Sequence, residues 1–113
     1  MTPLKPGTMK LQVAFDDDLS HGLRLFREIA PIIDIAEVGT PLVFREGMHA
    51  VRRIREEYPE VSLLADLKIM DAGEEEARIA FDAGADFVTV MAVAHDATIE
   101  GAARSAHRYN RRV

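Results

Sequence analysis

Four short apolar runs alternate with four amphipathic segments along this chain of 113 residues. The runs are rich in Val, Ile, Leu and Phe, which is typical of strands buried in a parallel sheet. We expect strands at about residues 11–15, 33–38, 61–65 and 86–91, and helices at about 19–30, 46–58, 74–83 and 98–109. Each strand–helix unit is roughly 25 residues long, as in right-handed crossover units. The pattern predicts one α/β domain with a parallel sheet.

Local signals predict where several elements begin and end. Asp18 or Ser20 can cap the first helix, and Gly84 can end the third. The Gly-Thr-Pro sequence at 39–41 predicts a loop, and the arginines of the helix at 46–58 are expected to face solvent. Residues 111–113 resemble the first step into a fifth strand, and residues 1–8 a flexible leader.

Two architectures fit this alternation: a small doubly wound sheet, or part of a (β/α)8 TIM barrel. A nucleotide-binding sheet needs a Gly-rich loop after its first strand, where this chain has Asp16-Asp17-Asp18. Acidic residues also lie near the ends of the next two strands, at Glu37 and Asp66. TIM-barrel enzymes collect catalytic groups at the carboxyl ends of several strands. We therefore expect about the first four βα units of a TIM barrel, because a whole barrel needs at least ~200 residues.

An ionisable cluster follows the third apolar run. Asp66 and Lys68 are two residues apart, so along a strand they face the same way, and Asp71 lies beyond the strand end. A solvated surface cluster is one interpretation. We favour a functional site, because the flanking run is apolar and a buried charge is costly unless it is paired or used.

Four sequence blocks occur in order at the expected strands: LQVAFD (11–16), EVGTPL (37–42), DLKIMDAG (66–73) and AGADFVTV (83–90). Together they resemble the 3-hexulose-6-phosphate synthases of the orotidine 5′-monophosphate decarboxylase suprafamily. The D-x-K-x-x-D pattern of that suprafamily matches Asp66, Lys68 and Asp71. The resemblance covers residues 9–113 and implies the N-terminal half of a sugar-phosphate lyase barrel. A close relative is 3-keto-L-gulonate-6-phosphate decarboxylase.

The resemblance implies roles for the cluster. Glu37 and Asp66 would bind Mg²⁺, which prefers hard oxygen ligands completed by water and substrate. Glu37 would also contact substrate. Lys68 would be a protonated donor to the same substrate oxygens, held between Asp66 and Asp71. Asp71 would act in catalysis by reaching across a homodimer interface into the partner's site.

The resemblance implies lesser roles for residues outside the motif. Asp16 would bind substrate hydroxyls or orient Lys68, and so counts among the catalytic candidates. Thr40 would contact substrate, although a turn-forming role is an equal alternative. His95 lies beyond the fourth strand on the side where chemistry happens, but family members commonly have another residue there.

The implied reaction is Mg²⁺-dependent addition of formaldehyde to ribulose 5-phosphate through an enediolate; in the decarboxylase, loss of CO₂ forms the enediolate. Family members place a proton-transferring His after strand 5 and their phosphate-binding loops after strands 7 and 8, and no residue here matches those positions. Three hypotheses therefore stay open: a partial synthase-type chain, a non-catalytic half-barrel assembly module, and a split enzyme completed by a second polypeptide.

The composition limits the kinds of partner and the cellular compartment that we expect for this chain. The net charge is −5 and no Lys/Arg run is long enough to follow a phosphate backbone, so a nucleic-acid partner is not expected. No apolar segment has the length of a membrane span. The chain has no cysteine, which is compatible with a cytoplasmic location.

Overall fold

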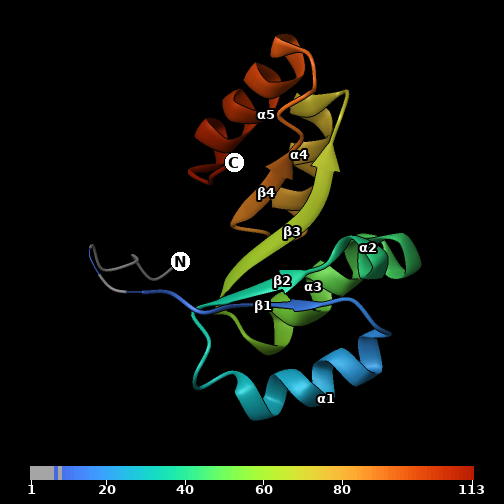
Figure 1. Ribbon diagram of the computed structural model, residues 1–113, viewed down its shortest axis with the longest axis vertical. Helices are drawn as coiled ribbons and strands as arrows, with labels where there is room; N and C mark the ends of the chain where they lie inside the picture. The colour runs from blue at the N-terminus through green and yellow to red at the C-terminus, as the bar shows by residue number, and fades with distance from the viewer. Residues whose placement is uncertain (1–6, 8) are drawn as a thin grey trace.

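The computed structural model describes Gly7 and residues 9–113, so most of the expected leader at 1–8 lies outside the described residues. Four parallel strands form one sheet in the order β1-β2-β3-β4 (Figure 1). The strands are β1 (Gln12–Phe15), β2 (Ile35–Val38), β3 (Ser62–Ile69) and β4 (Phe87–Val90). The helices are α1 (Leu19–Ile29), α2 (Thr40–Glu46), α3 (Met48–Glu57), α4 (Gly73–Asp82) and α5 (Asp96–Tyr109).

The strand order separates the two expected architectures. Each strand pairs with the next one along the chain, whereas a doubly wound sheet reverses its order at a switch point. The long strand β3 joins β1 and β2 on one side to β4 on the other (Figure 1). Sequential pairing is the arrangement of a TIM barrel, so the expected half barrel of four βα units is confirmed.

Only one face of the sheet is fully packed. Alternate strand residues, among them Phe15, Val38, Leu63, Ala65 and Val88, are buried. Their neighbours on the other face are exposed or half-buried: Ala14, Ile35, Leu64 and Phe87. In a complete barrel this second face points inward, so we call it the inner face.

The core on the packed face follows the predicted amphipathic stripes. Phe26 of α1 is fully buried, with its ring centroid 5.5 Å from that of Phe15 and 4.1 Å from that of Tyr58. The predicted cap is also present, because Asp18 accepts a hydrogen bond from the His21 backbone N–H at 2.9 Å. None of the helices in the described part of the chain has the length and apolar character needed to cross a membrane.

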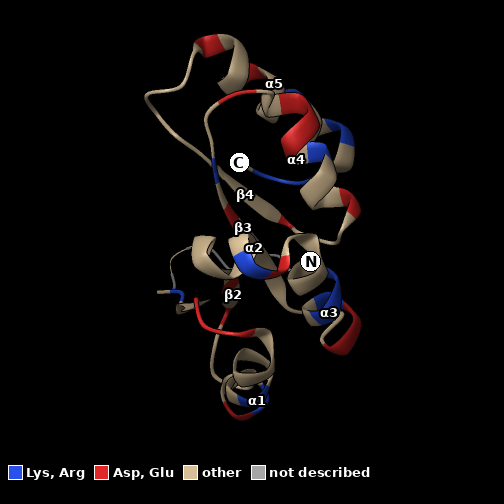
Figure 2. Cartoon of the chain, turned by 90° about the vertical axis from the view of Figure 1, so that its right-hand side faces the viewer, with Lys and Arg blue, Asp and Glu red and all other residues tan. Residues whose placement is uncertain are grey.

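The acidic first turn of α4 suits the positive end of the helix dipole. Figure 2 shows this acidic turn beside α5. Glu74 pairs there with Arg104, at 3.3 Å, and with Arg108. These exposed pairs lie at the helix surface and contribute little stability individually.

The prediction of a loop at residues 39–41 is wrong. Thr40 and Pro41 begin helix α2, with Gly39 as its N-cap and Pro41 in the first turn, where proline is favoured. The helix predicted at about 46–58 is present as α3, and α2 is an additional helix before it that ends at Gly47, whose φ is 57°. The third strand is also longer than predicted, because β3 continues through the motif to Ile69.

The expectation of a solvated arginine face on residues 46–58 fails at Arg55. Its guanidinium donates to Asp86 at 2.6 Å and to the carbonyls of Pro59, Val61 and Gly84 at 2.7–3.0 Å. Asp86 is 1% exposed and also lies 3.2 Å from Arg111. This network ties the loops that precede β3 and β4 to α3.

An isolated parallel bridge lies where the sequence predicts the first step into a fifth strand. Arg112 forms a parallel bridge with Phe87, supported by hydrogen bonds from Arg112 N to Asp86 O at 3.1 Å and from Val88 N to Arg112 O at 3.2 Å. The outer edge of β4 is thus partly paired.

The Arg55 network predicts an unequal response of two arginines on α3. Arg55→Met leaves the Asp86 carboxylate buried without its main partner, so we expect a loss of about 3 kcal/mol in the free energy of unfolding. Arg53→Met removes only exposed pairs with Glu56 and Glu57, so a loss of about 0–1 kcal/mol is expected. Urea denaturation of both variants tests this, and equal losses would contradict the assigned role of Arg55.

Candidate functional site

The candidate site is built on an irregularity in β3. Ala65 pairs with Val88 and Ile69 with Val90, so residues 66–68 lie opposite Thr89 alone. Lys68 has a φ of 48°, in the left-handed region, which costs about 1–3 kcal/mol for a residue with a side chain. The insertion adds two residues, so the alternation of faces is kept and Asp66 and Lys68 share a side, as predicted.

Hydrogen bonds gather around the Asp66 carboxylate. Its Oδ1 accepts from Thr89 Oγ1 at 2.7 Å, and its Oδ2 accepts from Thr40 Oγ1 at 2.8 Å. Oδ2 also forms an ion pair with Lys68 Nζ, which in turn donates to Thr40 Oγ1 at 2.7 Å. The side chain of Asp66 is 14% exposed and that of Lys68 is 52% exposed. The carboxylate is therefore enclosed while the ammonium faces the open end of the site.

The environment of Asp66 favours its ionised form. Burial raises the pKa of this carboxyl, but hydrogen bonds from Lys68, Thr89 and Thr40 together outweigh burial and hold the pKa below its ordinary value. Asp66 is therefore a carboxylate at neutral pH, suited to accept from donors or to bind a cation.

Two further predicted residues lie on neighbouring strands. Glu37 is on the inner face beside Leu64 in the register, one pleat from Asp66, and its Oε2 accepts from Gln12 Nε2 at 2.6 Å. Asp16 follows β1, and its carboxylate lies against Gly39: a Cβ on Gly39 would be 1.8 Å from Asp16 Oδ1. This close approach explains why glycine stands before the first turn of α2.

The donor set is compatible with Mg²⁺ in its chemistry. Among the described residues no three His, Cys, Asp or Glu side chains converge on one point. Mg²⁺ is commonly bound by one or two carboxylates, with water and substrate completing six ligands. Glu37 and the ionised Asp66 present hard oxygens on the same face of adjacent strands, so they could supply such a pair.

Asp71 and His95 lie outside the contacts of the cluster. Asp71 is exposed just beyond β3, and among the described residues the ion pair of Lys68 is with Asp66 and not with Asp71 or Asp16. Burial, and then the nearby charge of Asp71, raise the pKa of Glu76 on α4. His95 is exposed at the N-cap of α5, where its carbonyl accepts from Thr98 N at 2.8 Å.

The sequence interpretation missed Thr89. Strand alternation offers a signal for it, because a residue two positions after Phe87 in β4 lies on the inner face at the carboxyl end of the strand. The start of α2 was missed as well, so the helical position of Thr40 beside Asp66 could not be foreseen.

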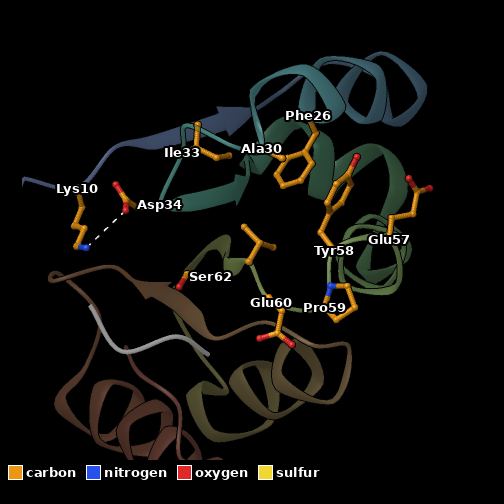
Figure 3. Close-up of a pocket in the computed structure, with 11 residues that line it drawn as sticks. Lys10, Phe26, Ala30, Ile33, Asp34, Glu57, Tyr58, Pro59, Glu60 and Ser62 are labelled. Carbon is orange, nitrogen blue, oxygen red and sulfur yellow. Dashed lines mark ion pairs between the residues drawn. The ribbon is translucent and has the colours of Figure 1, made fainter. Parts of the chain in front are cut away.

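Two cavities flank the sheet at opposite ends. One of about 250 Å³ adjoins the cluster and is lined by Thr40, Glu76 and apolar side chains of α2, α3, α4 and β3. A larger one of about 480 Å³ lies at the amino ends of the strands, where Phe26 and Tyr58 face the ion pair of Lys10 and Asp34 at 3.6 Å (Figure 3). We place the candidate site at the carboxyl ends, because α/β folds bind their ligands there.

Sequence comparison finds relatives that are longer than this chain. It is 43% identical over 106 residues to the 3-hexulose-6-phosphate synthase of Bacillus subtilis (strain 168), covering 93% of this chain and 50% of that protein. It is 46% identical over 106 residues to the 3-hexulose-6-phosphate synthase of Mycobacterium gastri, covering 93% and 51%. The chain thus spans about half the length of the curated relatives it matches.

The chain also superposes on about half of the length of several solved structures. A crystal structure of a 3-hexulose-6-phosphate synthase superposes with a TM-score of 0.89 at 46% identity, covering 91% of this chain and 50% of that one. The 3-keto-L-gulonate-6-phosphate decarboxylase of Vibrio cholerae gives 0.88 at 40% identity, covering 89% and 48%. The KGPDC of Streptococcus mutans, solved in complex with a sugar phosphate, gives 0.85 at 28% identity, covering 89% and 47%.

The family model described as Orotidine 5'-phosphate decarboxylase / HUMPS family matches residues 9–113. That match, the identities above and the sequential parallel sheet agree with one another. The chain belongs to the orotidine 5'-phosphate decarboxylase / HUMPS family and corresponds to the N-terminal half of its TIM barrel.

Proposed function

We propose that this chain supplies the metal- and substrate-binding half of a 3-hexulose-6-phosphate synthase-like aldolase, which adds formaldehyde to ribulose 5-phosphate. The observation that carries the proposal is the cluster in which Lys68 pairs with Asp66 and both contact Thr40. It lies at the carboxyl end of β3, where barrel enzymes hold their catalytic groups.

Each residue has a task in this proposal. The Lys68 ammonium, 52% exposed and held toward Asp66, donates to substrate oxygens on which negative charge develops. Asp66 pairs with that ammonium and, with Glu37, would hold Mg²⁺; the ion would supply Lewis-acid stabilisation of the same charge. Thr40 orients Lys68, Asp16 binds substrate hydroxyls, and Asp71 acts from a partner copy.

A sugar phosphate is the proposed substrate class. The sugar-phosphate complex of the Streptococcus mutans relative supports this class for the family. The second candidate is decarboxylation of 3-keto-L-gulonate 6-phosphate, which the 40% identity to the Vibrio cholerae decarboxylase favours. The cluster serves both reactions equally, because each passes through negative charge on the same substrate oxygens.

A homodimer in the cytoplasm is part of the proposal. The homodimer is supported by exposed apolar side chains near the cluster. Phe44 is 85% exposed, Met70 is 49% exposed and Ile79 is 43% exposed. Phe44 and Ile79 also line the smaller cavity. Apolar side chains gathered in this way are typical of protein contacts. A non-catalytic assembly module is the alternative of a different class, supported by the half-buried apolar residues of the inner face.

We expect a chimera that joins residues 9–113 to the rest of the Mycobacterium gastri synthase to consume formaldehyde in the presence of ribulose 5-phosphate and Mg²⁺. Asp66→Ala should reduce kcat/KM by about 100-fold or more, because it removes a metal ligand and the partner of Lys68. The control is Asp17→Ala, an exposed residue whose only ion pair among the described residues is with His21; it should keep near-full activity.

The outcomes separate the hypotheses. Turnover of 3-keto-L-gulonate 6-phosphate in place of formaldehyde addition would favour the decarboxylase. A chimera that folds but converts neither substrate would favour the assembly module. Activity that appears when the chain is mixed with a separately expressed C-terminal half would support a split enzyme, because mass action then governs assembly.

We expect Phe44→Glu to weaken self-association, because it places a charge within the exposed apolar surface of α2. Sedimentation equilibrium should show the dissociation constant rising about tenfold or more. Ile32→Glu is the matched control, since Ile32 is 70% exposed beyond α1, at the amino end of β2. Equal weakening by both variants would place the contact elsewhere.

A further inference from the structure

We propose that Thr89 is a positioning residue: its hydroxyl bridges the Lys68 main chain and the Asp66 carboxylate, and thereby fixes the β3 irregularity that presents Lys68. The two hydrogen bonds of this bridge are present in the structure. Its consequence for catalysis rests on the function proposed above.

The direction of both hydrogen bonds is fixed. Thr89 Oγ1 accepts from the Lys68 backbone N–H at 2.9 Å and lies 2.7 Å from Asp66 Oδ1. An N–H can only donate and an ionised carboxylate can only accept, so the single hydroxyl proton of Thr89 goes to Asp66. Among side chains of this size, only serine offers the same donor and acceptor.

The irregularity in β3 makes this bridge necessary. The parallel ladder pairs Ala65 with Val88 and then resumes at Ile69 and Val90, so the Lys68 N–H has no ladder partner on β4. Thr89 is the only β4 residue opposite the inserted segment, and its side chain takes the place of the missing carbonyl. The left-handed φ of Lys68 is held by this contact and by the resumed ladder bond from Met91 N to Ile69 O at 3.0 Å.

The position of Thr89 argues against a role in core packing. It lies on the inner face and is half-buried, while its neighbour Val88 faces the helices and is 2% exposed. Thr40 Oγ1 accepts from the Lys68 ammonium and lies 2.8 Å from Asp66 Oδ2 and 2.7 Å from the Asp66 carbonyl oxygen, so it acts on the Asp66 side of the segment. Among the described residues of the cluster, Thr89 alone accepts from the Lys68 backbone N–H, the main-chain group at the irregularity.

Amide hydrogen exchange followed by NMR on the full chain tests the bridge. In Thr89→Val the Lys68 N–H should exchange about fivefold faster or more, because its acceptor is lost. Thr89→Ser should restore slow exchange, since it keeps the hydroxyl. Thr98→Val, at a threonine of α5 that is 9% exposed, is the matched control and should leave Lys68 unchanged.

The Met91 N–H provides an internal reference, because its bond to Ile69 lies just beyond the irregularity. Unchanged exchange at Lys68 in Thr89→Val, or an equal acceleration at Met91, would overturn the proposal. If Thr89→Val does not fold, Thr89→Ala gives the same comparison without a branched apolar side chain.

A second readout links the bridge to chemistry. In the active chimera Thr89→Val should lower kcat about tenfold with little change in KM, and Thr89→Ser should recover it. A changed KM with kcat intact would overturn the positioning role. The exchange experiment needs no activity, so a chimera without turnover would count against the proposed function and leave the test of Thr89 in place.

Discussion

An ionised carboxylate at the end of an apolar strand must be paired, and much of this chain is arranged around that constraint at Asp66. Its partners come from three elements: Thr40 at the start of α2, Lys68 in β3 and Thr89 in β4. Bringing Lys68 back toward Asp66 requires the insertion in β3 and a left-handed residue. The strain is local and is offset by hydrogen bonds that the insertion itself makes possible.

The same sheet carries a second ion-paired aspartate, Asp86, whose partners differ from those of Asp66. Asp86, at the amino end of β4, is 1% exposed and is held by the guanidinium groups of Arg55 and Arg111. Asp66, at the carboxyl end of β3, is partnered by a lysine that is 52% exposed. The Asp86 arrangement is buried and joins the loops that precede β3 and β4 to α3. The Asp66 arrangement leaves the Lys68 ammonium accessible, as a binding site requires.

Alternating apolar runs were sufficient to predict the four strands and their parallel pairing, and the two-residue spacing of Asp66 and Lys68 predicted that both side chains face the same way. The errors came from features that a pattern of hydrophobicity does not encode. Helix α2 was missed because Gly39-Thr40-Pro41 is an equally good turn signal, and the choice depends on Thr40 meeting Asp66 across the sheet. Arg55 was assigned to solvent because its partner, Asp86, lies 31 residues away. Thr89 reads as an ordinary strand residue until the irregularity in β3 places it opposite Lys68.

The Asp66 cluster and the inner face of the sheet differ in where along the chain their contacts come from. Among the described residues, the hydrogen-bond and ion-pair partners of the Asp66 carboxylate lie within 40–89, so the chain forms this cluster from its own consecutive βα units. The inner face differs, because Ile35, Leu64 and Phe87 remain half-buried and no helix among the described residues covers them. In a closed barrel such residues are covered by strands from the other half. A polypeptide that completes the inner face would also enclose Lys68, and a lower local dielectric strengthens its attraction to developing negative charge. Burial of the apolar face and the electrostatics of the cluster are therefore coupled.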